Sequence, residues 1–185
     1  MKLDLFSIPI WIGNIDASKI IVDDTDLSET FRSEIKTSFS EQNNIPQDSL
    51  DYLYDVIIKL LNRSITRPYN IKLGHIWNNY YESDDYQEIH THPGSDVSFI
   101  IYKKIKESST IFQNPNSSVI GSYYYSSDTL TKLVGNLDYR PECRENQIVV
   151  FPSFLEHYVR KTSNALTVSG NMKITIDEWL LTTIF

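Results

Sequence analysis

The sequence has a single cysteine, Cys143, among 185 residues. One thiol can form neither an internal disulfide nor a cluster of several thiolates around zinc. This composition is typical of proteins in a reducing compartment, so we expect the chain in the cytoplasm.

Long apolar runs and an excess of basic residues are also missing. No run approaches the ~20 apolar residues that span a bilayer, and the opening residues MKLDLFSIPIWIG have no signal-peptide cleavage site. The 17 Lys and Arg residues are outnumbered by 24 Asp and Glu, which gives a formal charge of -7. We therefore expect no membrane partner and no nucleic-acid partner, because phosphate binding depends on clustered Lys and Arg.

What is present is the composition of a globular protein, with 41% apolar and 22% charged residues. A chain of this length is expected to form one domain with a substantial core. Twelve Tyr, eight Phe and three Trp supply much of the apolar volume.

The first third predicts a strand and two supporting helices over residues 1–66. Residues 3–12 have the apolar and aromatic composition of a half-buried strand. Apolar residues recur every four positions from Leu27 to Phe39, which predicts a first amphipathic helix. Residues 49–64 place their apolar residues on one face and predict a second.

From residue 67 to 185 the pattern changes to short segments of β-branched and aromatic residues between turns. Two helices followed by many strands indicate an α+β fold, in which a sheet pair or barrel carries the helices on one outer face. The predicted strands are 71–80, 86–92, 96–105, 110–112, 119–125, 131–134, 147–151, 157–160, 165–174 and 178–184.

Three of the four histidines form a candidate metal site. His90 and His92 are two positions apart on a predicted strand, so both side chains point to the same face. His157 begins another predicted strand, after the segment VVFPSFLE. Imidazole ligands with open coordination positions suit iron, zinc, copper and nickel alike. His75 has no partner in the sequence, and we interpret it as structural.

The segments WNNYYESDDYQEIHTHPGSDVSFIIY and NQIVVFPSFLEHYV, with a later SGN, resemble a family of small 2-oxoglutarate/Fe(II)-dependent oxygenases of bacteria and phages. The shared features are Trp-x-Asn, His-x-His-Pro-Gly-Ser, Phe-Pro-Ser-x-x-x-His and Ser-x-Asn, between Trp77 and Asn171. The resemblance implies a double-stranded β-helix of the jelly-roll or cupin type, Fe(II) and 2-oxoglutarate as cofactors, and oxidation of a C–H bond. A phage-encoded member would act in the host cytoplasm.

The resemblance also implies the metal ligands. Related oxygenases use His-x-Asp/Glu and a distant His, so His90 and His157 take the two histidine positions and His92 replaces the carboxylate. Because this exchange removes a negative charge, Asp96 in the following turn is a candidate further ligand. A turn-capping role for Asp96 is an equal alternative.

The co-substrate residues are less clearly matched. Tyr80 and Tyr102 stand where related enzymes place tyrosines toward 2-oxoglutarate. Family members have an arginine before Ser-x-Asn, but this chain has Ala165 or Leu166 there. A cation for the far carboxylate would then come from one of the nearby basic residues, and strand alternation favours Lys104, on the face of Tyr102, over Lys103. The candidates after His157 are Arg160 and Lys161.

Two alternatives keep the barrel without 2-oxoglutarate. The segment HTHPGSD also resembles the cupin pattern, which would give a four-ligand site of His90, His92, Asp96 and His157, although Phe154 replaces a cupin glycine. A barrel without its co-substrate anchor would instead be a non-catalytic binding module. The sequence leaves the substrate open as a small molecule or a protein, and the tyrosine-rich GSYYYSSD suits a pocket wall or a homodimer surface.

Overall fold

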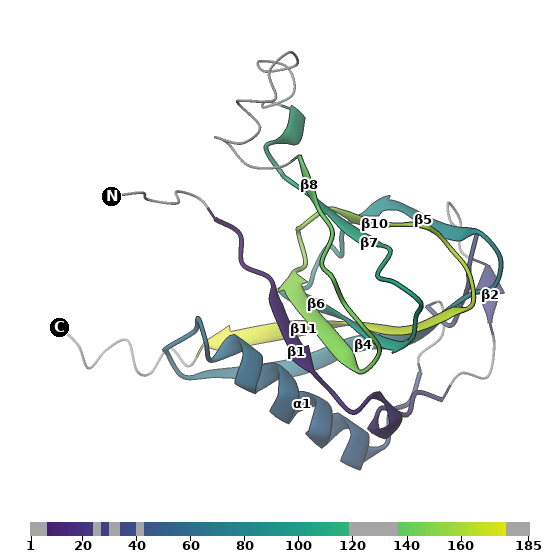
Figure 1. Cartoon of the computed structure of the whole chain (residues 1–185). Helices are drawn as coiled ribbons and strands as arrows, with labels where there is room; N and C mark the ends of the chain where they lie inside the picture. Colours follow the sequence, from purple (N-terminus) through teal and green to yellow (C-terminus); the bar gives the residue numbers. More distant parts are fainter. Residues whose placement is uncertain (1–6, 24–26, 30–33, 40–42, 119–136, 177–185) are drawn as a thin grey trace.

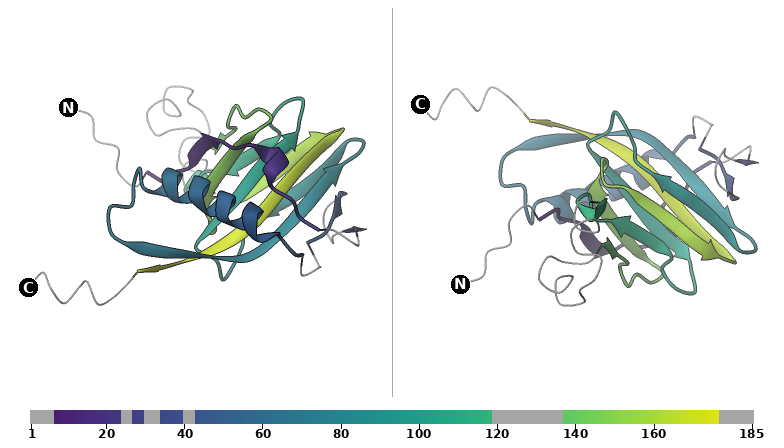
Figure 2. Two further views of the ribbon diagram at one scale, coloured as in Figure 1. Left: turned by 90° about the horizontal axis from the view of Figure 1, so that it is seen from below. Right: turned by 90° about the horizontal axis from the view of Figure 1, so that it is seen from above.

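The computed structural model describes residues 7–23, 27–29, 34–39, 43–118 and 137–176 (Figure 1). Two antiparallel sheets face each other across the interior of the protein (Figures 1 and 2). The larger sheet contains, in spatial order, β1 (Trp11–Asn14), β9 (Gln147–Pro152), β6 (Val97–Lys104), β11 (Ala165–Ile176), β4 (Tyr69–Tyr81), β3 (Lys36–Thr37) and β2 (Ser28–Glu29). The smaller sheet contains β5 (Asp85–His90), β10 (His157–Thr162), β7 (Thr110–Gln113) and β8 (Asp138–Tyr139).

The helix α1 (Gln47–Leu61) covers the outer face of the larger sheet (Figure 2). Its apolar stripe of Leu53, Ile57 and Leu61 is completely buried, in the same cluster as side chains of β4, β6 and β11. This confirms the second predicted helix. The short 3-10 helix η1 (Ala17–Lys19) is tied to α1 by Ser49 Oγ, which donates to Lys19 O at 2.6 Å.

The first predicted helix, over residues 27–39, is wrong. Ser28–Glu29 and Lys36–Thr37 form the strand pair β2–β3, and β3 continues the larger sheet by pairing with the end of β4. The stripe of apolar residues four apart was too thin to decide the structure, because an available sheet edge satisfies the backbone of this segment equally well.

Most predicted strands are confirmed within a few residues. The opening strand begins later than predicted, at Trp11, and β8 was not predicted at all. The predicted strands 119–125, 131–134 and 178–184 lie outside the described residues. None of the helices in the described part of the chain is long and apolar enough to cross a membrane.

Two layers of apolar side chains flank the larger sheet. One lies between this sheet and α1, and includes Ile76, Ile101 and Val168. The other faces the smaller sheet and includes Tyr102, Phe112 and Phe151. Strand alternation therefore divides each central strand between the helix and the interior, where polar side chains are also found.

Gly170, in the centre of β11, provides a test of this packing. A Cβ atom there would overlap the ring of Phe99 and would lie 2.8 Å from the backbone oxygen of His75. We predict that Gly170→Ala lowers the free energy of unfolding by about 1–3 kcal/mol, because neither group can move without disturbing the sheet. Urea denaturation followed by circular dichroism measures the change.

Gly74→Ala on the neighbouring β4 is the matched control. Its Cβ would have ordinary van der Waals contact, 3.4 Å from Asn171 O, so we expect a change within about 0.5 kcal/mol. Equal stabilities of the two variants would contradict the packing described for Gly170.

Candidate metal centre

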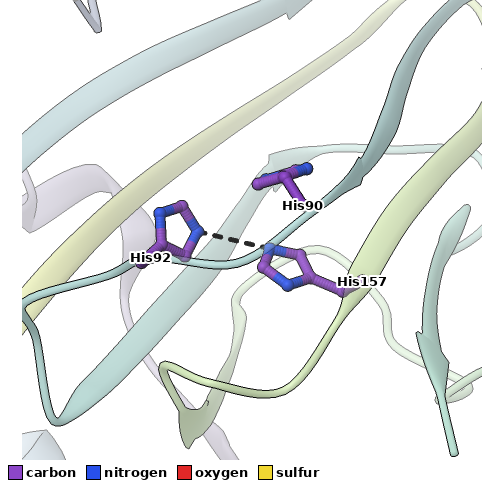
Figure 3. A group of neighbouring side chains, drawn as sticks. All are labelled: His90, His92 and His157. Carbon is purple, nitrogen blue, oxygen red and sulfur yellow. Dashed lines mark hydrogen bonds between the residues drawn. The ribbon is translucent and has the colours of Figure 1, made fainter. Parts of the chain in front are cut away.

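His90, His92 and His157 converge on one point between the two sheets (Figure 3). One ring nitrogen from each lies within 4.8 Å of the others. His90 is the last residue of β5 and His157 is the first of β10, and the two residues are direct partners in the antiparallel register. Cross-strand partners have neighbouring side chains on the same face, so the register itself brings these two rings together.

His92 lies beyond the end of β5, in the turn toward β6. Its backbone N–H donates to Ser153 O at 3.0 Å, and Ser153 N–H donates to Asp96 O at 3.0 Å. These bonds fasten the His-x-His turn to the loop between β9 and β10. The third imidazole is therefore positioned by a loop-to-loop contact and not by strand alternation alone.

Backbone carbonyls set the tautomers of two of the rings. His90 Nδ1 lies 2.7 Å from Glu88 O, and His157 Nδ1 lies 2.9 Å from Leu155 O. Because a carbonyl oxygen only accepts hydrogen bonds, both Nδ1 atoms carry the proton, and both Nε2 atoms present a lone pair. Fixing a histidine through its second nitrogen in this way is typical of metal ligands.

The contact between His92 and His157 shows what the site requires. Their Nε2 atoms are 3.3 Å apart (Figure 3), close to the ~3 Å between two imidazole nitrogens that bind one metal about 2.1 Å away at a right angle. Since the lone pair of His157 Nε2 points at His92, a proton or a cation must lie between the two nitrogens. The donor set thus fits a divalent transition metal.

The three imidazoles are also held in the neutral form that metals bind. Burial lowers the pKa of His90. Burial, and secondarily the neighbouring His90, lower the pKa of His92 to about 4. For His157, burial is again the largest cause, followed by His90 and His92, and its pKa lies well below the usual value.

Asp96 is not part of this cluster. Its Oδ2 accepts from the backbone N–H of Ile174 at 2.8 Å, and its Oδ1 lies 4.0 Å from Lys173 Nζ. The group of potential ligands found among the described residues contains the three histidines alone. The hydrogen bond supports the structural alternative for Asp96, since its carboxylate holds the end of β11.

A narrow cavity of about 30 Å³ extends from the histidines into the space between the sheets. Tyr102 lines it and is almost completely buried, and its hydroxyl donates to Thr110 Oγ1 at 3.0 Å. Tyr81 of β4, and not the predicted Tyr80, also lines the cavity and donates to Gln87 Oε1 at 2.8 Å. Alternation from the cavity-lining Trp77 along β4 would have selected Tyr81.

The basic residues predicted to bind the far carboxylate of 2-oxoglutarate do not line this cavity. Tyr102 of β6 pairs with Thr167 of β11. Lys104 pairs with the preceding residue of β11, Leu166, because a bulge inserts Lys103 into β6. Consecutive residues point to opposite faces, so the prediction that Tyr102 and Lys104 share a face is wrong. Lys104 Nζ instead donates to Asn164 Oδ1 at 2.6 Å.

The other candidates are also placed by the structure. Arg160 is exposed, and together with Lys161 it lines a separate open groove along β5 and β10. Of the two residues at the position expected for an arginine, Ala165 is buried and lines the cavity, whereas Leu166 does not line it. His75 packs against the rings of both Phe39 and Trp77, with centroid distances of 5.1 Å to each, and is not part of the histidine cluster.

A family model described as "Putative 2OG-Fe(II) oxygenase" matches residues 75–169. The search of curated proteins gave no match.

Solved structures of similar fold include three proteins of low sequence identity. A prolyl hydroxylase from Trichoplax adhaerens, in complex with a hypoxia inducible factor peptide, has a TM-score of 0.56 at 13% identity, over 95% of this chain and 87% of that one. HygX from Streptomyces hygroscopicus, with nickel, 2-oxoglutarate and hygromycin B bound, has a TM-score of 0.54 at 10% identity, over 90% and 82%. A prolyl-4-hydroxylase from Pseudomonas putida has a TM-score of 0.50 at 14% identity, over 80% and 76%. At these sequence identities the comparison shows similarity of fold alone.

We predict that replacing His90, His92 or His157 by alanine lowers the affinity for a divalent metal by at least about 100-fold, since each removes one of three ligands. Anaerobic titration with Fe(II) or Co(II), followed by absorption spectroscopy, measures the affinity.

The matched controls are His75→Ala and Asp96→Ala. Both should bind metal like the unchanged protein, while Asp96→Ala should lose about 0.5–1.5 kcal/mol of stability because Ile174 N–H loses its protein acceptor at an exposed position. A large loss of metal affinity in Asp96→Ala would restore the four-ligand alternative.

The thiol of Cys143 generates a prediction about alkaline pH. Burial raises its pKa from 9.0 to about 11. Because the folded protein then holds this proton more tightly than the unfolded chain, the stabilisation is complete below pH 9.0 and is lost as the pH rises through about 11. Urea denaturation across this pH range should show a smaller loss of stability for Cys143→Ala than for the unchanged protein. Parallel curves of stability against pH for the two proteins would contradict the raised pKa of Cys143.

Proposed function

Because the chain belongs to the family of 2OG-Fe(II) oxygenases whose model it matches, we propose that His90, His92 and His157 hold Fe(II) and that the enzyme hydroxylates a C–H bond of its substrate. The family depends on Fe(II) and 2-oxoglutarate. When bound, these two groups supply the activation of O2, and the protein supplies binding, orientation and exclusion of water.

The observation that carries this proposal is the arrangement of three neutral imidazoles around one point, with the lone pairs of His90 and His157 fixed by backbone carbonyls. Three protein ligands on one side of a metal leave positions for a co-substrate and oxygen. A closed structural site would have had a fourth protein ligand.

The surroundings of the three rings support a protected reaction centre. The rings of Phe112 and Phe151 pack against His157, with centroid distances of 5.9 and 4.8 Å. On the other side, the ring of Trp77 lies 5.6 Å from that of His92. Apolar neighbours lower the local dielectric, which strengthens binding of an anionic co-substrate to a cation held by neutral ligands.

We further propose that the two facing sheets form a double-stranded β-helix and that the chain is a single domain. The N-terminal strands β1, β2 and β3 pair within the same sheet as the later strands β4, β6, β9 and β11. This shared sheet supports one folding unit with the metal site enclosed between its layers. The single cysteine supports a cytoplasmic location, which would be that of the host for a phage-encoded chain.

The cavity fits the two ends of 2-oxoglutarate unequally. Its far part is the part away from the histidines, near Ile105, Glu107 and Ala165. The open positions at the histidines suit the keto-acid end. The far end has Ala165 at the position expected for arginine, and no Lys or Arg is among the described residues that line it. Of the predicted co-substrate residues, Tyr102 lines this space, whereas Tyr80, Lys104 and Arg160 do not.

The proposed function is tested with purified protein, Fe(II) and 2-oxoglutarate. We expect a visible charge-transfer band when 2-oxoglutarate is added without oxygen, and O2-dependent conversion of 2-oxoglutarate to succinate and CO2 when oxygen is admitted. His157→Ala should show neither, and Arg160→Ala should behave like the unchanged protein. Metal binding without the band would reject the oxygenase in favour of a simple metal-binding barrel.

A further inference from the structure

We infer that this chain recognises its co-substrate by the keto-acid end and discriminates only weakly for a charged tail, so that 2-oxo acids with uncharged tails also bind. The inference rests on the proposed function, since it concerns the same cavity. It differs from the binding mode expected for a dicarboxylate such as 2-oxoglutarate, whose far carboxylate requires a compensating cation.

Apolar side chains occupy much of the far part of the cavity. Its lining includes Ile105, which follows β6, Val159 within β10 and Ala165 at the start of β11. Ile105 enters this space because the bulge at Lys103 changes the alternation after Tyr102. The same irregularity that turns Lys104 away therefore places an aliphatic side chain where a co-substrate tail would lie.

Two of the polar groups in this lining are tyrosine hydroxyls that donate to protein acceptors. Tyr102 donates to Thr110, and Tyr81 donates to Gln87. Burial raises the pKa of both phenols, which keeps them uncharged. Such hydroxyls can accept or share hydrogen bonds with a tail, but they do not supply the positive charge that a buried carboxylate needs.

The charged side chain in this lining, among the described residues, is an acid. Glu107 lines the cavity, and its Oε2 lies 2.6 Å from Arg140 Nη2. Arg140 Nε also donates to Ser108 O at 2.6 Å, so two of its donor groups are already bound. A tail carboxylate would have to displace Glu107 from Arg140 or accept its negative charge nearby.

A further basic residue near the end of the cavity away from the histidines, Lys104, does not point inward. Lys104 shares the face of Leu166, opposite to that of Tyr102, and is exposed. Its ammonium group donates to the amide oxygen of Asn164, in the turn that precedes β11. The gain from a charged tail is thus limited, whereas a well-placed charge-assisted pair would be worth about tenfold to a hundredfold in affinity.

The test compares two co-substrates of equal chain length in the protein loaded with Fe(II) under anaerobic conditions. Titration with 2-oxoglutarate and with 2-oxopentanoate, which lacks the far carboxylate, is followed by the visible absorption of the metal complex. We expect dissociation constants within about threefold of each other. A preference for 2-oxoglutarate of more than about tenfold would overturn the inference and leave the proposed function intact.

Glu107→Gln gives a second measurement on the same cavity. Removing this exposed and therefore solvent-screened negative charge should improve the affinity for 2-oxoglutarate by no more than about threefold and leave 2-oxopentanoate unchanged. Glu142→Gln is the matched control, because Glu142 is an exposed acid at the same end that does not line the cavity. Equal effects of Glu107→Gln and Glu142→Gln, or of Glu107→Gln on both 2-oxo acids, would contradict the role of the cavity charge.

These titrations distinguish failure of the proposed function from failure of this inference. If Fe(II) binds but neither 2-oxo acid changes the spectrum, the proposed function is rejected together with this inference. If both bind but 2-oxoglutarate is strongly preferred, and Lys104→Ala or Arg140→Ala removes that preference, the family activity stands and the tail has a cationic anchor.

Discussion

The structure depends on the antiparallel register that pairs His90 with His157. These residues end β5 and begin β10, so one strand pairing brings together rings that are far apart in the sequence. Both rings are then fixed by carbonyls two residues earlier in the chain. Lone pairs directed at a shared point in a partly desolvated space repel one another, and a bound cation is the natural way to satisfy them.

The remainder of the fold supports this pairing from two sides. The helix α1 and the outer face of the larger sheet form an apolar core that is separate from the metal site. On the opposite face, Phe112 and Phe151 pack around His157 and restrict its ring. The loop between β9 and β10 holds His92 through Ser153 O. The centre is thus built on strand ends and a short loop that rigid layers hold in place, an arrangement that suits a site requiring fixed ligands and an open side.

The histidine cluster of the candidate site could be predicted from the sequence, but the residues that line the co-substrate end of the cavity could not. His-x-His spacing and the motif ending in His157 were sufficient to predict the three histidines that meet in the structure. The helix predicted over residues 27–39 is not formed at Ser28–Glu29 or Lys36–Thr37, because local periodicity competed with the edge of a sheet formed by residues distant in the chain. The prediction that Lys104 shares a face with Tyr102 failed because one inserted residue, Lys103, reverses the alternation of side chains. Such a bulge leaves no clear signal in the sequence pattern.

The sequence by itself determined the residue types that can bind a metal, the strand-rich second part of the chain and the absence of an arginine before Ser-x-Asn, because these depend on composition and short-range spacing. Tertiary structure alone decided that Asp96 caps β11, that Tyr81 replaces Tyr80 in the cavity and that the far end is lined by Ile105, Ala165 and Glu107. These outcomes depend on register and on loop contacts between distant segments, which local chain preferences do not specify.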